Sequence, residues 1–226
     1  MNTVSNNGST HDHLIRDLAT DLAPVRRLWP ATFRALGWLA IVAAIATVLA
    51  MSADLPAVAR RLTAAPDMWL AATGTLATAI LAAVSAFQLS LPDARRAWAF
   101  LPLPAALLWI AASSAGCLRM WLVPGTHIAG LGEARECLVI ILGLSVPLSA
   151  LMIFMLKRAY SLQQGLMAAV GGLAVAAAAA TLLNFFHPFD AAATDLAVHA
   201  CAVALVILAN WVLSGRLLTK NFNGGT

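Results

Sequence analysis

Apolar residues fill six long stretches of the chain, and polar residues gather between them. The stretches run over 35–53, 68–88, 99–118, 137–156, 165–186 and 195–214, and none carries a charge at its centre. A helix needs roughly 20 mostly apolar residues to cross a bilayer, and each stretch comes close to that length. The pattern predicts an all-α polytopic membrane protein with a bundle of six transmembrane helices.

The one substantial polar segment comes before the first apolar stretch. Residues 1–10 are polar and show no apolar periodicity, so we expect them to be disordered. From His11 onward apolar residues recur at helical spacing, which predicts a short amphipathic helix that ends or kinks near Pro24. The chain then divides into an N-terminal segment over 1–34, a transmembrane domain over 35–215 and a tail over 216–226.

Composition and charge placement support a membrane protein and orient it. The chain is 61% hydrophobic and only 11% charged, whereas charged residues make up about a quarter of a soluble domain. Of its 14 lysines and arginines, all lie on one side of the predicted bundle except Arg60, Arg61, Arg119 and Arg135. The positive-inside rule places that side, and with it both termini, in the cytoplasm. The net charge of +4 therefore reflects topology, and we expect no direct contact with nucleic acid.

The apolar stretches offer little for catalysis or ion transport. Their deep polar residues are Ser113, Ser114, Ser145, Ser149 and Asn210. Ionisable residues inside a membrane are the usual sign of an ion path, and the centres of these stretches have none. No hydrolase elbow, metalloprotease motif or P-loop occurs in the chain. We therefore predict a protein that is not an enzyme, with no catalytic residues and no cofactor.

Cysteines and histidines gather on the side opposite the termini. Cys117 ends the third stretch, Cys137 begins the fourth, and Cys201 lies in the outer part of the sixth. In an oxidising compartment two thiols can form a disulfide, and thiolate with imidazole can bind a metal. The signal-sensing candidates are Cys117, Cys137, His187 and Cys201, and the metal candidates are His187, Asp190, Asp195 and His199. In the alternative, structural interpretation, the cysteines are small apolar fillers and the two aspartates cap the last helix.

The amphipathic N-terminal helix also has two interpretations. Its apolar stripe could lie on membrane lipid at the anionic inner surface, or it could dock in a groove of a cytoplasmic protein. Asp12, Asp17 and Asp21 repel anionic lipid, so we favour a protein partner.

Several groups of residues, taken in order, resemble one known family. They are Leu14-Ile15-Arg16-Asp17-Leu18 with the segment from Asp21 to Leu28, then Glu136-Cys137-Leu138, Leu144-Ser145-Val146-Pro147-Leu148, and Phe186-His187-Pro188. In this order, and with six spans, the chain is similar to the NrsF-like polytopic membrane anti-sigma factors from about Leu14 onward. Relatives often carry a cysteine directly after the histidine of the last outer loop, where this chain has Pro188. A thiol-pair switch would therefore need Cys201 or Cys117 as the substitute.

The resemblance implies an anti-sigma factor of the bacterial inner membrane. Such a protein holds an extracytoplasmic-function sigma factor through its cytoplasmic N-terminal segment and releases it on a stress signal. Cys137 would match a family cysteine at the outer end of the fourth helix. The implied partner-binding residues are Leu14, Ile15, Leu18, Asp21, Leu22, Pro24, Val25 and Leu28.

A transporter is the alternative to an anti-sigma factor. In a small-molecule transporter or permease-like protein the N-terminal helix would be only a surface anchor. A polar cavity near the middle of the membrane would then be required. The candidate lining residues are Ser145, Ser149 and Asn210.

Overall fold

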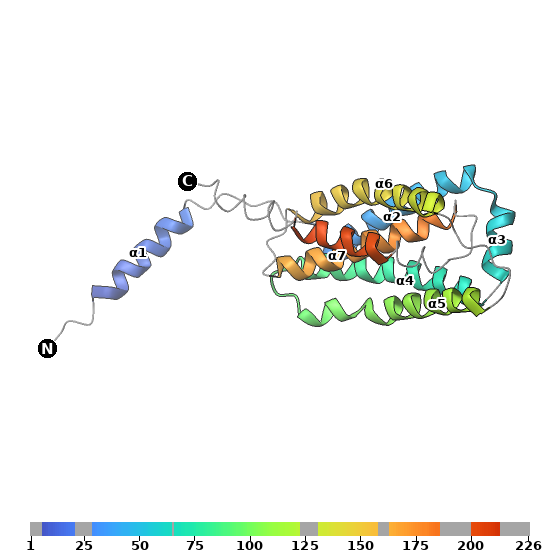
Figure 1. The fold of residues 1–226 in the computed structure, drawn as a ribbon. Helices are drawn as coiled ribbons and strands as arrows, with labels where there is room; N and C mark the ends of the chain where they lie inside the picture. The colour runs from blue at the N-terminus through green and yellow to red at the C-terminus, as the bar shows by residue number, and fades with distance from the viewer. Residues whose placement is uncertain are drawn as a thin grey trace.

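The computed structural model describes residues 6–20, 29–64, 66–122, 131–157, 163–185 and 200–212. In chain order the elements are α1 (Asn6–Thr20), α2 (Ala31–Ser52), α3 (Leu55–Ala64), α4 (Pro66–Leu89), η1 (Arg96–Phe100), α5 (Leu103–Leu122), α6 (Leu131–Leu156), α7 (Gln164–Leu183) and a last helix, Ala200–Val212 (Figure 1). The described residues contain no strand. The all-α prediction is confirmed for this part of the chain.

Five helical segments are long and apolar enough to cross a bilayer. They are Ala31–Ser52, Pro66–Leu89, Arg96–Gly116, Val139–Leu156 and Gln164–Leu183. These segments match the first five predicted stretches, so the chain has the helices of a polytopic membrane protein. The sixth stretch, predicted over 195–214, is described only as the shorter apolar helix Ala200–Val212, because the residues on either side of it lie outside the described part.

Both α1 and α2 begin earlier than the sequence predicted. α1 begins at Asn6, so residues 6–10, which we expected to be disordered, are helical. Extending a helix costs far less than nucleating one, and the amphipathic part supplies the nucleus. α2 begins at Ala31. Arg34, which we had assigned to the N-terminal segment, therefore lies in the first turn of a membrane helix.

The helix α3 is an element that the hydrophobic pattern did not predict. Asp54 caps its start, because the backbone N–H of Ala57 donates to Asp54 Oδ1 at 3.0 Å. The helix is too short to cross a bilayer, and it packs against α4 with Val58 buried. Since α4 runs from α3 to η1, these two short elements lie at opposite ends of the bundle (Figure 1). The connection between α2 and α4 is therefore an ordered helix.

Small residues bring α4 close to α5, and α7 close to the last helix. The small-residue faces of α4 and α7 are buried, and they consist of Gly74, Thr78, Ala82, Gly172, Ala176 and Ala180. A Cβ on Gly74 would lie 2.9 Å from the Cα of Trp109 on α5, and one on Gly172 would lie 2.8 Å from the Cα of Ile207 on the last helix. Both faces are packing surfaces, because only small residues let helix backbones approach so closely.

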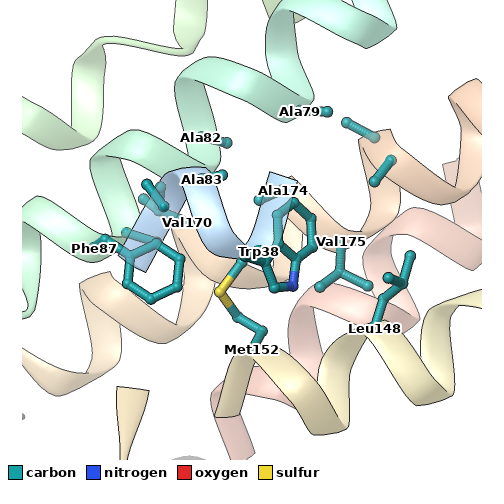
Figure 2. Packing of buried hydrophobic residues seen from close by; sticks show 14 of the residues in the cluster. Trp38, Ala79, Ala82, Ala83, Phe87, Leu148, Met152, Val170, Ala174 and Val175 are labelled. Carbon is teal, nitrogen blue, oxygen red and sulfur yellow. The ribbon is translucent and has the colours of Figure 1, made fainter. Parts of the chain in front are cut away.

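Trp38 attaches α2 to this centre. Its side chain is fully buried, and it lies among Phe87 of α4, Met152 of α6 and Val175 of α7 (Figure 2). The indole N–H has no hydrogen-bond partner in the described part of the chain, so packing alone holds the ring. The buried residues of α2 all lie in its first half, and they are Ala31, Arg34, Ala35 and Trp38. The N-terminal end of α2 is therefore its most tightly packed part.

Substituting Gly172 by alanine tests the close approach of α7 to the last helix. The added methyl group would meet backbone atoms of Ile207, which can move only if the whole helix moves. We expect Gly172→Ala to lower the free energy of unfolding by about 1–3 kcal/mol, the usual cost of overpacking. The measurement is the thermal unfolding midpoint of the purified protein in detergent, followed by tryptophan fluorescence.

Gly143→Ala is the matched control for this substitution. Gly143 is an exposed residue of α6, and a Cβ there would meet nothing within 4 Å. We expect its unfolding midpoint to equal that of the parent or to rise slightly, because alanine favours a helix over glycine. Equal midpoints for both variants and the parent would contradict the packing of α7 described here.

Candidate functional site

The predicted partner-binding stripe lies on α1, which stands apart from the transmembrane helices. Leu14, Ile15 and Leu18 are 57%, 64% and 63% exposed. Figure 1 draws α1 away from the bundle, and within the described residues α1 makes no substantial packing contact with another helix. Apolar side chains gathered on one exposed face mark an interaction surface. The face has no partner within the described chain.

Helical geometry separates this stripe from the charged side of α1. Leu14 and Leu18 are four residues apart and lie one above the other, with Ile15 beside them, whereas His13 and Arg16 fall on the opposite face. The hydroxyl of Thr20 donates to the carbonyl of Asp17 at 2.8 Å in the last turn. A 15-residue helix is marginal in water by itself. A surface that covers the stripe would therefore also stabilise the helix.

The rest of the predicted contact follows α1 along the chain. It consists of Asp21, Leu22, Pro24, Val25 and Leu28, which lie outside the described residues. Their part in binding, and the helix end predicted at Pro24, stay predictions.

Arg34 is a buried charged residue of the described bundle, and the sequence alone did not reveal its burial. Its side chain is only 8% exposed. One guanidinium nitrogen, Nη1, donates to Ser90 Oγ at 3.2 Å, and the other, Nη2, donates to the carbonyl of Met155 at 2.7 Å. The guanidinium also lies over the ring of Phe87, 5.2 Å from its centroid. One side chain of α2 thus binds the ends of two other helices.

The electrostatics at these helix ends favour a cation. Met155 is one of the last residues of α6, whose final carbonyls have no partner within the helix. Ser90 follows the last residue of α4, and its hydroxyl donates to the carbonyl of Phe87 at 2.6 Å. Helix C-termini carry partial negative charge. An arginine beside the first apolar stretch is usually interpreted as a topology signal, and only its burial shows this second role.

The structure places the three cysteines on three different helices. Cys117 lies near the end of α5, Cys137 near the start of α6, and Cys201 on the last helix, where it is exposed and not in a disulfide. The side chains of Cys117 and Cys137 lie outside the described residues. So do the remaining sensing and metal candidates, which are His187, Asp190, Asp195 and His199. The described part of the chain holds no group of three metal-binding side chains.

Helix packing brings two of these cysteine positions to neighbouring helices. Ala202 of the last helix packs in one cluster with Ile141 of α6 and with residues of α7. Cys201 adjoins Ala202, and Cys137 precedes Ile141 by one helical turn. In the described residues, α5 packs chiefly against α4 instead. Cys137 and Cys201 therefore lie on helices that pack together, whereas Cys117 lies on a helix that packs chiefly against α4.

The polar residues that a transporter would need for a cavity take part in helix packing. Asn210 is buried, and its Nδ2 donates to Ser149 Oγ at 2.9 Å and to the carbonyl of Val206 at 2.8 Å. This interaction joins the last helix to α6. Ser145 is buried on α6 without a hydrogen-bond partner in the described chain. Two of the three candidate lining residues thus bond to each other across a helix interface.

These features define a helical membrane protein with a separate amphipathic N-terminal helix. A family model described as negative regulator of sigma F, NrsF, matches residues 18–219. The chain belongs to this family, and the resemblance seen in the sequence is confirmed. Comparisons with curated proteins and with solved structures gave no significant match. The family description makes a sigma factor the expected partner, and the match begins at Leu18, within the stripe.

Oxidation tests which cysteines can pair. We expect a mild oxidant such as copper phenanthroline, which accepts the two electrons of the thiol pair, to link Cys137 to Cys201 in membranes. Both positions lie on helices that pack together at the same end of the bundle. Peptide mass spectrometry without reduction identifies the linked pair. The Cys201→Ser variant should give no such product, and a dominant link from Cys117 to either residue would contradict the helix arrangement.

Proposed function

We propose that this chain is an anti-sigma factor of the bacterial inner membrane. Its N-terminal segment sequesters an extracytoplasmic-function sigma factor in the cytoplasm, and a signal at the membrane or at its outer side releases that factor. The family description supports a sigma factor as the target. The observation that carries the proposal is the apolar stripe of α1, exposed and separate from the bundle.

The chemistry of α1 fits a protein groove better than a lipid surface. Leu14, Ile15 and Leu18 supply apolar anchors at helical spacing, which is how a helix binds in a groove. Asp12 and Asp17 are repelled by anionic lipid and suit a partner with basic residues around that groove. By occupying the groove, α1 would cover a surface that the sigma factor needs for transcription. This mode of action requires no catalysis.

The basic residues at one end of the bundle support a cytoplasmic N-terminal segment. The end that holds the start of α2 also carries Arg95, Arg96 and Lys157, all exposed. The positive-inside rule places this end in the cytoplasm. With the helix Ala200–Val212 as a sixth span, an even number of crossings returns the C-terminus to the same side. This arrangement gives the N-terminal segment direct access to a cytoplasmic sigma factor.

Release requires a signal that distinguishes the binding state from the non-binding state. Moving the population from mostly bound to mostly free takes several kcal/mol of differential free energy. A bond between Cys137 and Cys201 is our candidate source, because it would tie α6 to the last helix. The stimulus would then be oxidative, or a metal that binds the same thiolates.

Charge substitutions on the stripe test the proposed contact. Each buried leucine anchor contributes about 2 kcal/mol at a binding hot spot, and aspartate there would be desolvated without a partner. We expect Leu14→Asp with Leu18→Asp to weaken binding of the sigma factor at least about 100-fold. The measurement is co-purification, followed by titration of the full chain in lipid nanodiscs.

His13→Asp is the control, because it adds an aspartate to the opposite, exposed face of α1. The His13→Asp variant should bind the sigma factor with the affinity of the parent protein. A strain that produces the double aspartate variant should express the target genes constitutively, whereas the His13→Asp strain should keep them silent. Normal binding by the double variant would rule out the stripe as the contact and would favour the alternative function, a transporter.

A further inference from the structure

Arg34 joins the base of the N-terminal segment to the ends of two transmembrane helices. Trp29 and Pro30 lead directly into α2, and Arg34 lies in its first turn. Its two terminal nitrogens bind different helices, α4 through Ser90 and α6 through the carbonyl of Met155. The point at which the N-terminal segment leaves the bundle is therefore set by where these two helices end.

α6 is the helix that connects this point to the opposite side of the bundle. It runs from Leu131 to Leu156 without interruption and carries Cys137 near one end and Met155 near the other. Pro147 lies between them. Proline has no N–H, so the carbonyl of Gly143 loses its usual helical donor, and helices bend most readily at such positions. A bend at Pro147 would move Met155 relative to the outer half of α6.

We propose that Arg34 is a positioning residue that transmits a change in α6 to the N-terminal segment, an inference that rests on the proposed function for its binding readout. A shift of the Met155 carbonyl would pull the Arg34 guanidinium with it, and would thereby move the first turn of α2. The burial of Arg34 and its 2.7 Å bond to that carbonyl make the connection short and direct. The N-terminal segment would then change its position or exposure at the membrane surface.

The two-helix contact depends on the shape of the guanidinium. Its planar fork presents separate donors to Ser90 and to Met155, whereas a lysine ammonium is a single point of charge. A residue that served only for stability would lower the unfolding midpoint when replaced. It would leave the response of the N-terminal segment to α6 unchanged. The test must therefore measure coupling and not stability alone.

A double-mutant cycle between Pro147→Ala and Arg34→Met measures this coupling. The full chain is reconstituted in nanodiscs of phosphatidylethanolamine and phosphatidylglycerol, and its Kd for the sigma factor is measured in all four combinations. We expect Pro147→Ala to change the Kd at least about fivefold when Arg34 is intact, the lower end of measured couplings between sites. In the Arg34→Met background, and in the Arg34→Lys background, the change should be less than about twofold.

Amide hydrogen exchange over residues 31–36 gives a second readout that needs no partner. Pro147→Ala should alter exchange there only when Arg34 is intact. Val139→Ala, at an exposed position of the same helix away from the bend, is the control and should alter neither readout. Unfolding midpoints identify any variant that has lost its fold, and Ser90→Ala is the milder replacement because it removes one of the two contacts.

The outcomes separate the two proposals. If Pro147→Ala acts equally in both Arg34 backgrounds, or acts in neither, Arg34 does not transmit changes in α6. If the stripe variants of α1 bind normally, the proposed contact is wrong, and hydrogen exchange still decides the role of Arg34. A loss of coupling together with a loss of binding by the stripe variants supports both proposals.

Discussion

The close approach of helix backbones is the constraint on which this bundle depends. Lipid tails are as apolar as leucine side chains, so helices in a membrane gain stability from tight packing and not from leaving water. α7 meets this requirement with glycine and alanine along most of its length, and 14 of its 20 residues are buried. α4 provides the matching surface and also receives α5. The remaining helices are placed around this pair.

A few polar side chains then set how the outer helices are aligned. Arg34 binds α2 to the ends of α4 and α6, and Asn210 binds the last helix to Ser149 of α6. Gln163 adds a bond from its Nε2 to the carbonyl of Ala94 at 2.9 Å, which links the start of α7 to the connection after α4. Hydrogen bonds are directional, so they specify the rotation of each helix about its axis and its position along its neighbour, which apolar packing specifies less precisely. The Arg34 and Gln163 contacts lie at the end where the N-terminal segment joins.

Much of the fold could be predicted because the bilayer imposes a simple rule on the sequence. Five apolar stretches are helices of spanning length in the structure. α3 was missed because a short amphipathic helix lacks the long apolar run that marks a span. The start of α1 was missed because polar residues at a helix end lack the apolar periodicity used to find it.

The candidate site was predicted less completely, for reasons that can be traced to particular residues. The stripe of Leu14, Ile15 and Leu18 follows from helical spacing alone, and its exposure agrees with a binding surface. Arg34 could not be recognised, because its role depends on the ends of α4 and α6, which are remote in sequence. The neighbouring positions of Cys137 and Cys201 likewise depend on which helices pack together.

The unequal burial of α2 has a consequence for how the protein meets its bilayer. Only four of the 22 residues of α2 are buried, and they lie between Ala31 and Trp38. Beyond them α2 packs on the core only through partly buried side chains, which are Leu39, Val42, Ile45, Ala46 and Leu49. At a rise of about 1.5 Å per residue, the 22 residues of α2 extend about 33 Å, slightly more than the hydrocarbon thickness of about 30 Å. Hydrophobic mismatch is relieved by tilt, and a helix that is packed more tightly at one end tilts about that end. Bilayer thickness thus acts on α2 at Arg34.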